Sequence, residues 1–176
     1  MRRKIIVIFV LMLLFSVSGL ADDAADAKAI VKSFYKIQTF RNDGFSVQLI
    51  NKRKSWFTTE LYNIYLKTVR LEDAWEKKHP DEKPEFLGLG FHPQEEMYPQ
   101  IATFGKLIVT GETALVDVNF YYVEKNKKRT FHDKYVIELK KQGAKWLIND
   151  IIYDGKERIS ALMQKYIKEQ SPKRKP

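Results

Sequence analysis

The chain of 176 residues contains no cysteine. It therefore has no disulfide to support a fold, no thiol for nucleophilic or redox chemistry, and no cysteine for lipid attachment. Histidine is also scarce, and His79, His92 and His132 are scattered without the spacing of metal ligands. We expect no metal site and no cofactor, so any folded domain must depend on packing alone.

Motifs of the common enzyme classes are missing as well. There is no Gly-x-Ser-x-Gly turn that would present a nucleophilic serine. The stretch "GLGF" (88–91) lacks the length and the strand-to-helix context of a phosphate-binding loop. The stretch "HPQEE" (92–96) matches no metalloprotease pattern. Sequence motifs therefore assign no reaction to this chain.

Only one long apolar run is present, and it lies at the N-terminus. Arg2, Arg3 and Lys4 precede an apolar stretch from Ile5 to Phe15, and the small residues of "SVSGLA" follow. This order is that of a secretory signal peptide cleaved before Asp22, and the run is too short for a spanning helix. We predict a signal peptide over 1–21 and export to the periplasm, or to the extracellular space, without stable membrane insertion.

Positive charge exceeds negative charge. The formal net charge is +9, and it falls to +6 once the three basic residues of the signal segment are removed. The basic residues gather in "NKRK" (51–54), "EKNKKR" (124–129) and "SPKRKP" (171–176), which we interpret as two solvated loops and a disordered tail. Export argues against nucleic acid as a partner, whereas attraction to anionic envelope surfaces remains open.

Hydrophobic periodicity predicts the secondary structure of a single domain over 22–170. Helical spacing covers 24–40, a second stretch from Ser55 as N-cap to about Lys78, and 156–170. Prolines and glycines interrupt 79–102, which we expect to be a long loop at the rim of a site. Four stretches in which apolar and polar residues alternate then predict strands, namely 103–110, 113–123, 129–140 and 145–153. A Gly111-Glu112 turn and other short turns indicate an antiparallel meander, hence an α+β fold with the helices grouped on one face.

Three stretches carry a resemblance to a known group of proteins: "IVKSFYKI" (30–37), "LVDVNFYY" (115–122) and "KWLINDIIYDG" (145–155). With the helix that follows, they resemble a family of exported bacterial domains of unknown function. That family belongs to the cystatin-like, cone-shaped superfamily named after nuclear transport factor. The resemblance spans roughly 26–168 and implies a curved sheet wrapped round a helix, a concave pocket and possible homodimers. It implies no reaction, because the superfamily holds enzymes and binding proteins alike.

Two acids coincide with apolar faces of predicted strands. Strand alternation puts Asp133 on the face of Tyr135, and it puts Asp150 on the face of Trp146, Ile148 and Ile152. In a pocket, apolar surroundings and a neighbouring acid would raise the pKa of one carboxyl toward neutrality. Tyr35, Tyr122 and Tyr135 could donate hydrogen bonds to a developing oxyanion. These five residues, Tyr35, Tyr122, Asp133, Tyr135 and Asp150, are the candidate ligand-binding set, and the two acids are the only catalytic candidates.

A structural role for the two acids is the stronger interpretation. Asp150 comes shortly before the last predicted helix, so it could cap that helix or accept hydrogen bonds from loop amides. Either acid could instead pair with Arg129, Lys134 or Lys145, and a bulge could reverse the face. We therefore expect a non-catalytic envelope domain that binds an unidentified protein or small ligand. The alternatives are an inhibitor or immunity protein against a secreted toxin and a small isomerase- or dehydratase-like enzyme.

Overall fold

A computed structural model describes residues 22–36, 46–81, 91, 101–123, 126 and 128–170. The predicted signal peptide, the basic tail, most of the 79–102 segment and part of "EKNKKR" lie outside these residues. Among the described helices, none is both long enough and apolar enough to cross a membrane.

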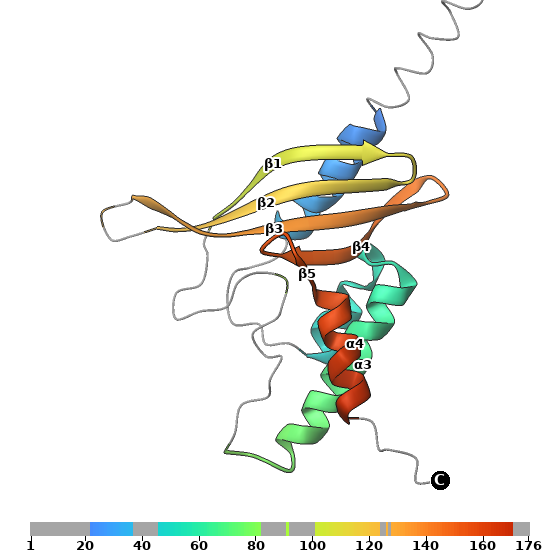
Figure 1. Cartoon of the computed structure of the whole chain (residues 1–176), viewed down its shortest axis with the longest axis vertical. Coiled ribbons are helices and arrows are strands. Elements are labelled where there is room, and N and C mark those ends of the chain that lie inside the picture. The colour runs from blue at the N-terminus through green and yellow to red at the C-terminus, as the bar shows by residue number, and fades with distance from the viewer. Residues whose placement is uncertain are drawn as a thin grey trace, which may run out of the picture.

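The N-terminal helices precede the sheet in the chain, and helix α4 (Ile159–Gln170) follows it (Figure 1). The first helix covers residues 22–36, and α2 (Val47–Lys52) follows. A short 3₁₀ turn, η1 (Lys54–Trp56), then leads into the long helix α3 (Thr59–Glu76). The N-cap of α3 is Thr58, whose hydroxyl accepts a hydrogen bond from the Leu61 N–H at 3.3 Å. The predicted start at Ser55 was therefore wrong, because Ser55 belongs to the 3₁₀ turn.

Within the described residues, the sheet is an antiparallel meander of five strands in the order β1-β2-β3-β4-β5. The strands are β1 (Ile101–Thr110), β2 (Thr113–Val123), β3 (Arg129–Gln142), β4 (Lys145–Tyr153) and β5 (Glu157–Arg158). The prediction of an α+β fold with an antiparallel sheet is confirmed, whereas the predicted count of four strands was wrong. The missed strand β5 follows a tight turn at Asp154 and Gly155, whose φ angles are both positive, at 46° and 66°. Such a turn folds the chain straight back on itself, so β5 pairs with the end of β4.

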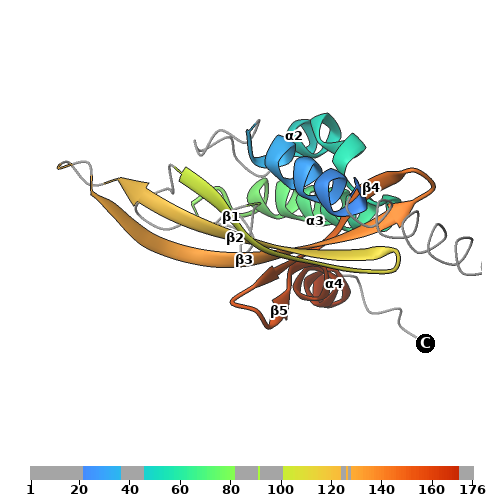
Figure 2. The ribbon, with the colours of Figure 1, turned by 90° about the horizontal axis from the view of Figure 1, so that it is seen from above.

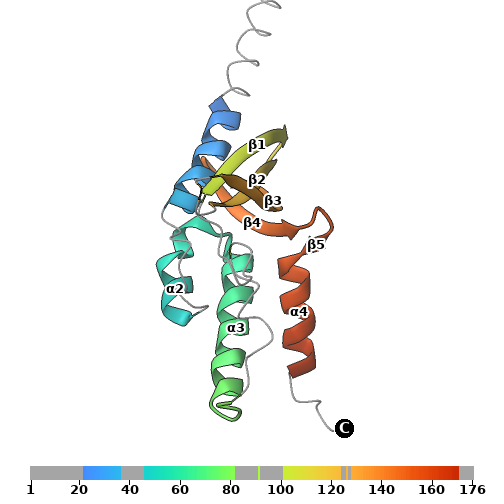
Figure 3. The ribbon, with the colours of Figure 1, turned by 90° about the vertical axis from the view of Figure 1, so that its left-hand side faces the viewer.

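The core lies between one face of the sheet and the N-terminal helices. Figure 2 shows the first helix, α2 and α3 on that face, with α4 (Ile159–Gln170) on the other side. Helix α4 runs beside α3 away from the sheet (Figure 3). The expectation that all helices share one face is therefore wrong for α4. Alternate residues of the central strands point inward and are buried, namely Ala114, Val116, Val118, Phe120, Tyr135, Ile137 and Leu139.

Candidate functional site

A bulge in β4 determines where Asp150 points. Leu139 of β3 pairs with Ile148, and the next pair along is Glu138 with Asp150, so Asn149 is the extra residue. One extra residue in a strand reverses the alternation beyond it. Ile151 therefore lies on the core face and is fully buried, while Ile152 is only half-buried. The expectation that Asp150 shares a face with Trp146 and Ile148 was wrong for this reason, because Asp150 and Ile152 both lie on the opposite face of the sheet.

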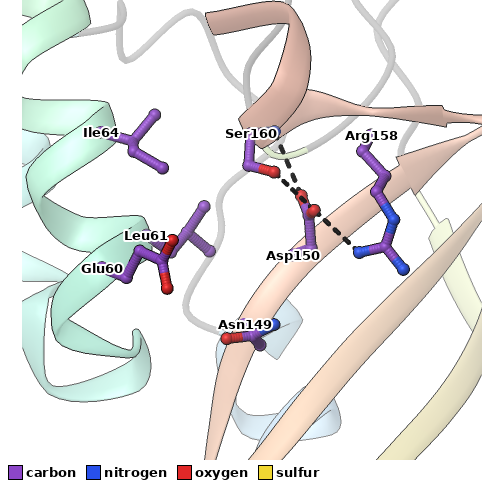
Figure 4. Close-up of a pocket in the computed structure, with 7 residues that line it drawn as sticks. All are labelled: Glu60, Leu61, Ile64, Asn149, Asp150, Arg158 and Ser160. Carbon is purple, nitrogen blue, oxygen red and sulfur yellow. Dashed lines mark hydrogen bonds and ion pairs between the residues drawn. The ribbon is translucent and has the colours of Figure 1, made fainter. Parts of the chain in front are cut away.

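Asp150 is nevertheless buried, with 3% of its surface exposed, because the start of α4 covers it. Its Oδ1 accepts hydrogen bonds from the backbone N–H groups of Ile151 at 2.9 Å and Ser160 at 3.1 Å. Its Oδ2 accepts from the Ser160 hydroxyl at 2.6 Å and from Arg158 Nη1 at 3.0 Å (Figure 4). A carboxylate beside the first N–H groups of a helix also interacts favourably with the helix dipole. Asp150 thus anchors β4 to the first turn of α4.

Arg158 connects Asp150 to a second carboxylate. Its Nη2 donates to Glu138 Oε2 at 2.6 Å, and Glu138 Oε1 accepts from Asn149 Nδ2 at 2.7 Å. The hydrogen bond from Arg158 is the main cause that lowers the pKa of Glu138, although partial burial opposes it. The same hydrogen bond to Glu138 raises the pKa of Arg158. We call Glu138, Asn149, Asp150, Arg158 and Ser160 the Asp150 cluster.

A small cavity of about 210 Å³ lies between this cluster and α3. Glu60, Leu61 and Ile64 of α3 form one wall, and Asn149, Asp150, Arg158 and Ser160 form the other (Figure 4). The Asp150 oxygens turn toward Ser160 and Arg158 rather than toward the α3 wall. All four hydrogen bonds that the Asp150 oxygens accept come from the chain itself, so neither oxygen is directed at a substrate in this cavity.

The second candidate acid is far from the first. Asp133 pairs with Phe120 of β2, whereas Asp150 pairs with Glu138, five residues further along β3. Five residues of strand correspond to about 17 Å. Asp133 Oδ1 accepts a hydrogen bond from the backbone N–H of Lys134 at 2.7 Å. The fold therefore does not bring the two acids together, and a shared proton between them is excluded.

Two of the three candidate tyrosines, Tyr35 and Tyr135, come close together, because both pack against the ring of Phe120. Tyr35 and Tyr135 are buried in the core, whereas Tyr122 is only half-buried near the end of β2. The Tyr35 hydroxyl donates a hydrogen bond to the backbone oxygen of Phe91 at 2.7 Å. Burial is the main cause that raises the pKa of Tyr35 well above its usual value. The ring of Phe91 is buried against Phe34, at 5.3 Å between ring centroids. Aromatic packing thus surrounds the hydrogen bond from the Tyr35 hydroxyl to Phe91.

Sequence patterns did not indicate two buried charges, Arg53 and Glu72 of α3. Arg53, within the "NKRK" stretch taken for a solvated loop, is only 3% exposed. Its guanidinium carbon lies 5.1 Å from the ring centroid of Phe91 and 5.9 Å from that of Phe34, within the range of cation–π attraction. The three-residue spacing from Ile50 to Arg53 was the available signal, because residues three apart share a helix face. Core packing thus includes one of the basic residues assigned to the surface.

Among the described residues, no three histidine or acidic side chains are grouped so as to hold a metal ion. The ring of His79 stacks on Trp75 at 4.5 Å, and His92 lies outside the described residues. The predicted site residues therefore belong to two features, the self-contained Asp150 cluster and the aromatic core that contains Tyr35 and Tyr135. No protein-family model, curated protein or solved structure matches the chain.

Proposed function

We propose that this chain is an exported envelope domain that binds a partner or a small ligand and catalyses no reaction. The observation that carries the proposal is the Asp150 carboxylate, which accepts four hydrogen bonds from its own chain. A general acid or base needs a free position from which to reach substrate. The separation of Asp133 from Asp150 and the hydrogen bond of Tyr35 to Phe91 support the same conclusion.

The proposal includes the location and the family of the domain. The basic and apolar N-terminal segment supports export with cleavage before Asp22. The order of helices, meander and final helix supports membership of the nuclear-transport-factor-like superfamily. N-terminal sequencing of the exported protein tests the first point and should read from Asp22. Recovery of intact Met1 on the exported protein would contradict it.

A turnover count separates binding from catalysis. The tagged, exported protein is incubated with an envelope extract, and small molecules are quantified by mass spectrometry before and after incubation. A binding domain depletes each ligand by no more than one molecule per protein and releases it unchanged on denaturation. A compound consumed in large molar excess over the protein would contradict the proposal. Failure to retain any protein or small molecule would contradict it as well.

A further inference from the structure

A second cavity, of about 520 Å³, lies where the end of α2 and the 3₁₀ turn η1 meet the start of β4. Three lysines line it, namely Lys52, Lys54 and Lys145. Asn51 and Ser55 add polar groups, and Phe57 and Leu147 are its apolar lining residues. We call this feature the lysine pocket. Its volume is comparable to that of small-molecule sites, and the pocket is broad and open to solvent.

A backbone connection holds the two sides of the lysine pocket together. Phe57 forms a parallel bridge with Ile148, and the Thr58 N–H donates to the Ile148 carbonyl at 2.9 Å. Because the two segments run in the same direction, residues shortly before Phe57 lie beside residues shortly before Ile148. Lys54 and Lys145 each come three residues before their bridging partner. The fold thus joins lysines that are 91 positions apart in the sequence.

Burial of Arg53 separates the roles of the "NKRK" residues. Arg53 turns into the core, while Lys52 and Lys54 on either side of it stay exposed. The Lys54 ammonium lies 5.1 Å from the ring centroid of Tyr62, whose hydroxyl donates to Asn51 Oδ1 at 2.7 Å. That contact places the Lys54 ammonium beside Tyr62, which is itself bonded to Asn51 of the pocket lining. Since the Asn51 carbonyl oxygen is an acceptor here, its amide nitrogen is oriented as the donor group.

The three lysines form no ion pair with any other residue that the structure describes. No acidic residue is among the residues that line the pocket. Three like charges around one cavity produce a positive potential that attracts an anion. Phe57 lines the pocket but is only 3% exposed, so it is the half-buried Leu147 that offers apolar surface and favours an anion with a hydrophobic body.

We propose that the lysine pocket binds a phosphate monoester or diester attached to an apolar body. This rests on the proposed function, because it names the ligand class of that binding domain. Lys52, Lys54 and Lys145 bind the phosphate oxygens, with Ser55 and Asn51 as additional donors. Leu147 contacts the apolar body. The same chemistry is found in an acidic phospholipid and in a soluble alkyl phosphate.

Calorimetric titration with inorganic phosphate and with octyl phosphate tests the ligand class. Octyl phosphate should bind more tightly than inorganic phosphate by about tenfold, because the chain adds apolar contact. A triple variant, K52Q/K54Q/K145Q, should lose at least about tenfold in affinity for octyl phosphate. Leu147→Asn should weaken octyl phosphate binding and leave inorganic phosphate binding unchanged. If the wild type bound both probes with equal affinity, the proposed contact between the pocket and the apolar body of the ligand would be contradicted.

The matched control removes three positive charges elsewhere. K67Q/K165Q/K168Q changes exposed lysines of α3 and α4 and lowers the net charge by the same amount. Its affinity for octyl phosphate should stay within about twofold of the wild type, since exposed charges more than about 10 Å apart are largely screened. Equal losses in both triple variants would overturn the proposal, because they would indicate attraction by net charge alone. Absence of binding to either probe would also overturn it.

Vesicle sedimentation distinguishes the two sources of the phosphate. If the source is lipid, the wild type sediments with phosphatidylglycerol vesicles but not with phosphatidylcholine vesicles, and K52Q/K54Q/K145Q does not sediment. If the source is soluble, octyl phosphate binds but no vesicle does. Suppose that the wild type and K52Q/K54Q/K145Q retain the same envelope partner equally and that neither binds phosphate. This result would refute the phosphate site but leave the proposed function standing. Loss of every partner and every probe would refute the proposed function too.

Discussion

The Asp150 cluster and the lysine pocket are both charged regions next to β4, but they differ in how their charges are satisfied. In the cluster, each carboxylate accepts hydrogen bonds from neighbouring side chains or backbone groups. In the pocket, three ammonium groups share a cavity without a carboxylate among its lining residues. Charges that the chain itself neutralises contribute to stability, whereas charges left facing solvent are available to a ligand. Substitutions in the two regions should therefore differ in what they change.

Asp150→Ala should have the largest effect. The substitution leaves the Ser160 N–H and hydroxyl without their acceptor at the start of α4, while Arg158, 45% exposed, can turn toward water. We expect the free energy of unfolding to fall by about 3 kcal/mol. Urea denaturation followed by circular dichroism measures this change. Asp117→Ala, which breaks the exposed Lys134–Asp117 pair, is the control and should cost less than about 1 kcal/mol. Similar losses in both variants would contradict the structural role of Asp150.

Glu138→Gln should alter the pH dependence of stability. The Arg158 hydrogen bond lowers the pKa of Glu138 in the folded protein, so the ionised form stabilises the fold. That contribution is fully present above the unfolded value of about 4.3 and is lost as the pH falls through the lower folded value. The unfolding free energy of the wild type should therefore decline more steeply with acid than that of Glu138→Gln. Glu157→Gln, at an exposed position, should keep the slope of the wild type. Identical slopes in the wild type and Glu138→Gln would refute the expectation.

K52Q/K54Q/K145Q should have the smallest effect on stability. The lysines are exposed and none takes part in an ion pair of the described chain. We expect the free energy of unfolding, measured by urea denaturation, to change by no more than about 0.5 kcal/mol. A loss comparable to that of Asp150→Ala would mean that the lysine pocket is part of the folded framework, and the contrast between the two regions would disappear.

Periodicity and turn residues predicted the helix–sheet order and the central strands because those features depend on local sequence. The inward sets of β2 and β3 follow strict alternation over their central residues, and the Gly111-Glu112 turn connects β1 and β2. The strand β5 had a local signal that was overlooked. Asp154-Gly155 is a dipeptide that favours a tight hairpin turn, so a fifth strand was predictable there.

The candidate sites depended on features that local patterns do not encode. A single bulge at Asn149 moved Asp150 to the other face of the sheet, and alternation gives no sign of a bulge. The partners of Asp150 come from β5 and α4, so their contact depends on the turn at Gly155. The lysine pocket joins Lys54 to Lys145 through a bridge between segments that are distant in the chain. The short α2 helix was likewise too brief to show a helical period.

The bridge between Phe57 and Ile148 also has a consequence for solubility. Strand β5 pairs only with Ile152 and Tyr153, so most of β4 would otherwise form an open edge of the sheet. An open edge can recruit a strand from another molecule and start aggregation. The Thr58 N–H already occupies the Ile148 carbonyl, and the bulge at Asn149 interrupts the regular backbone beside it. The connection that assembles the lysine pocket thus also protects this edge from intermolecular β-pairing.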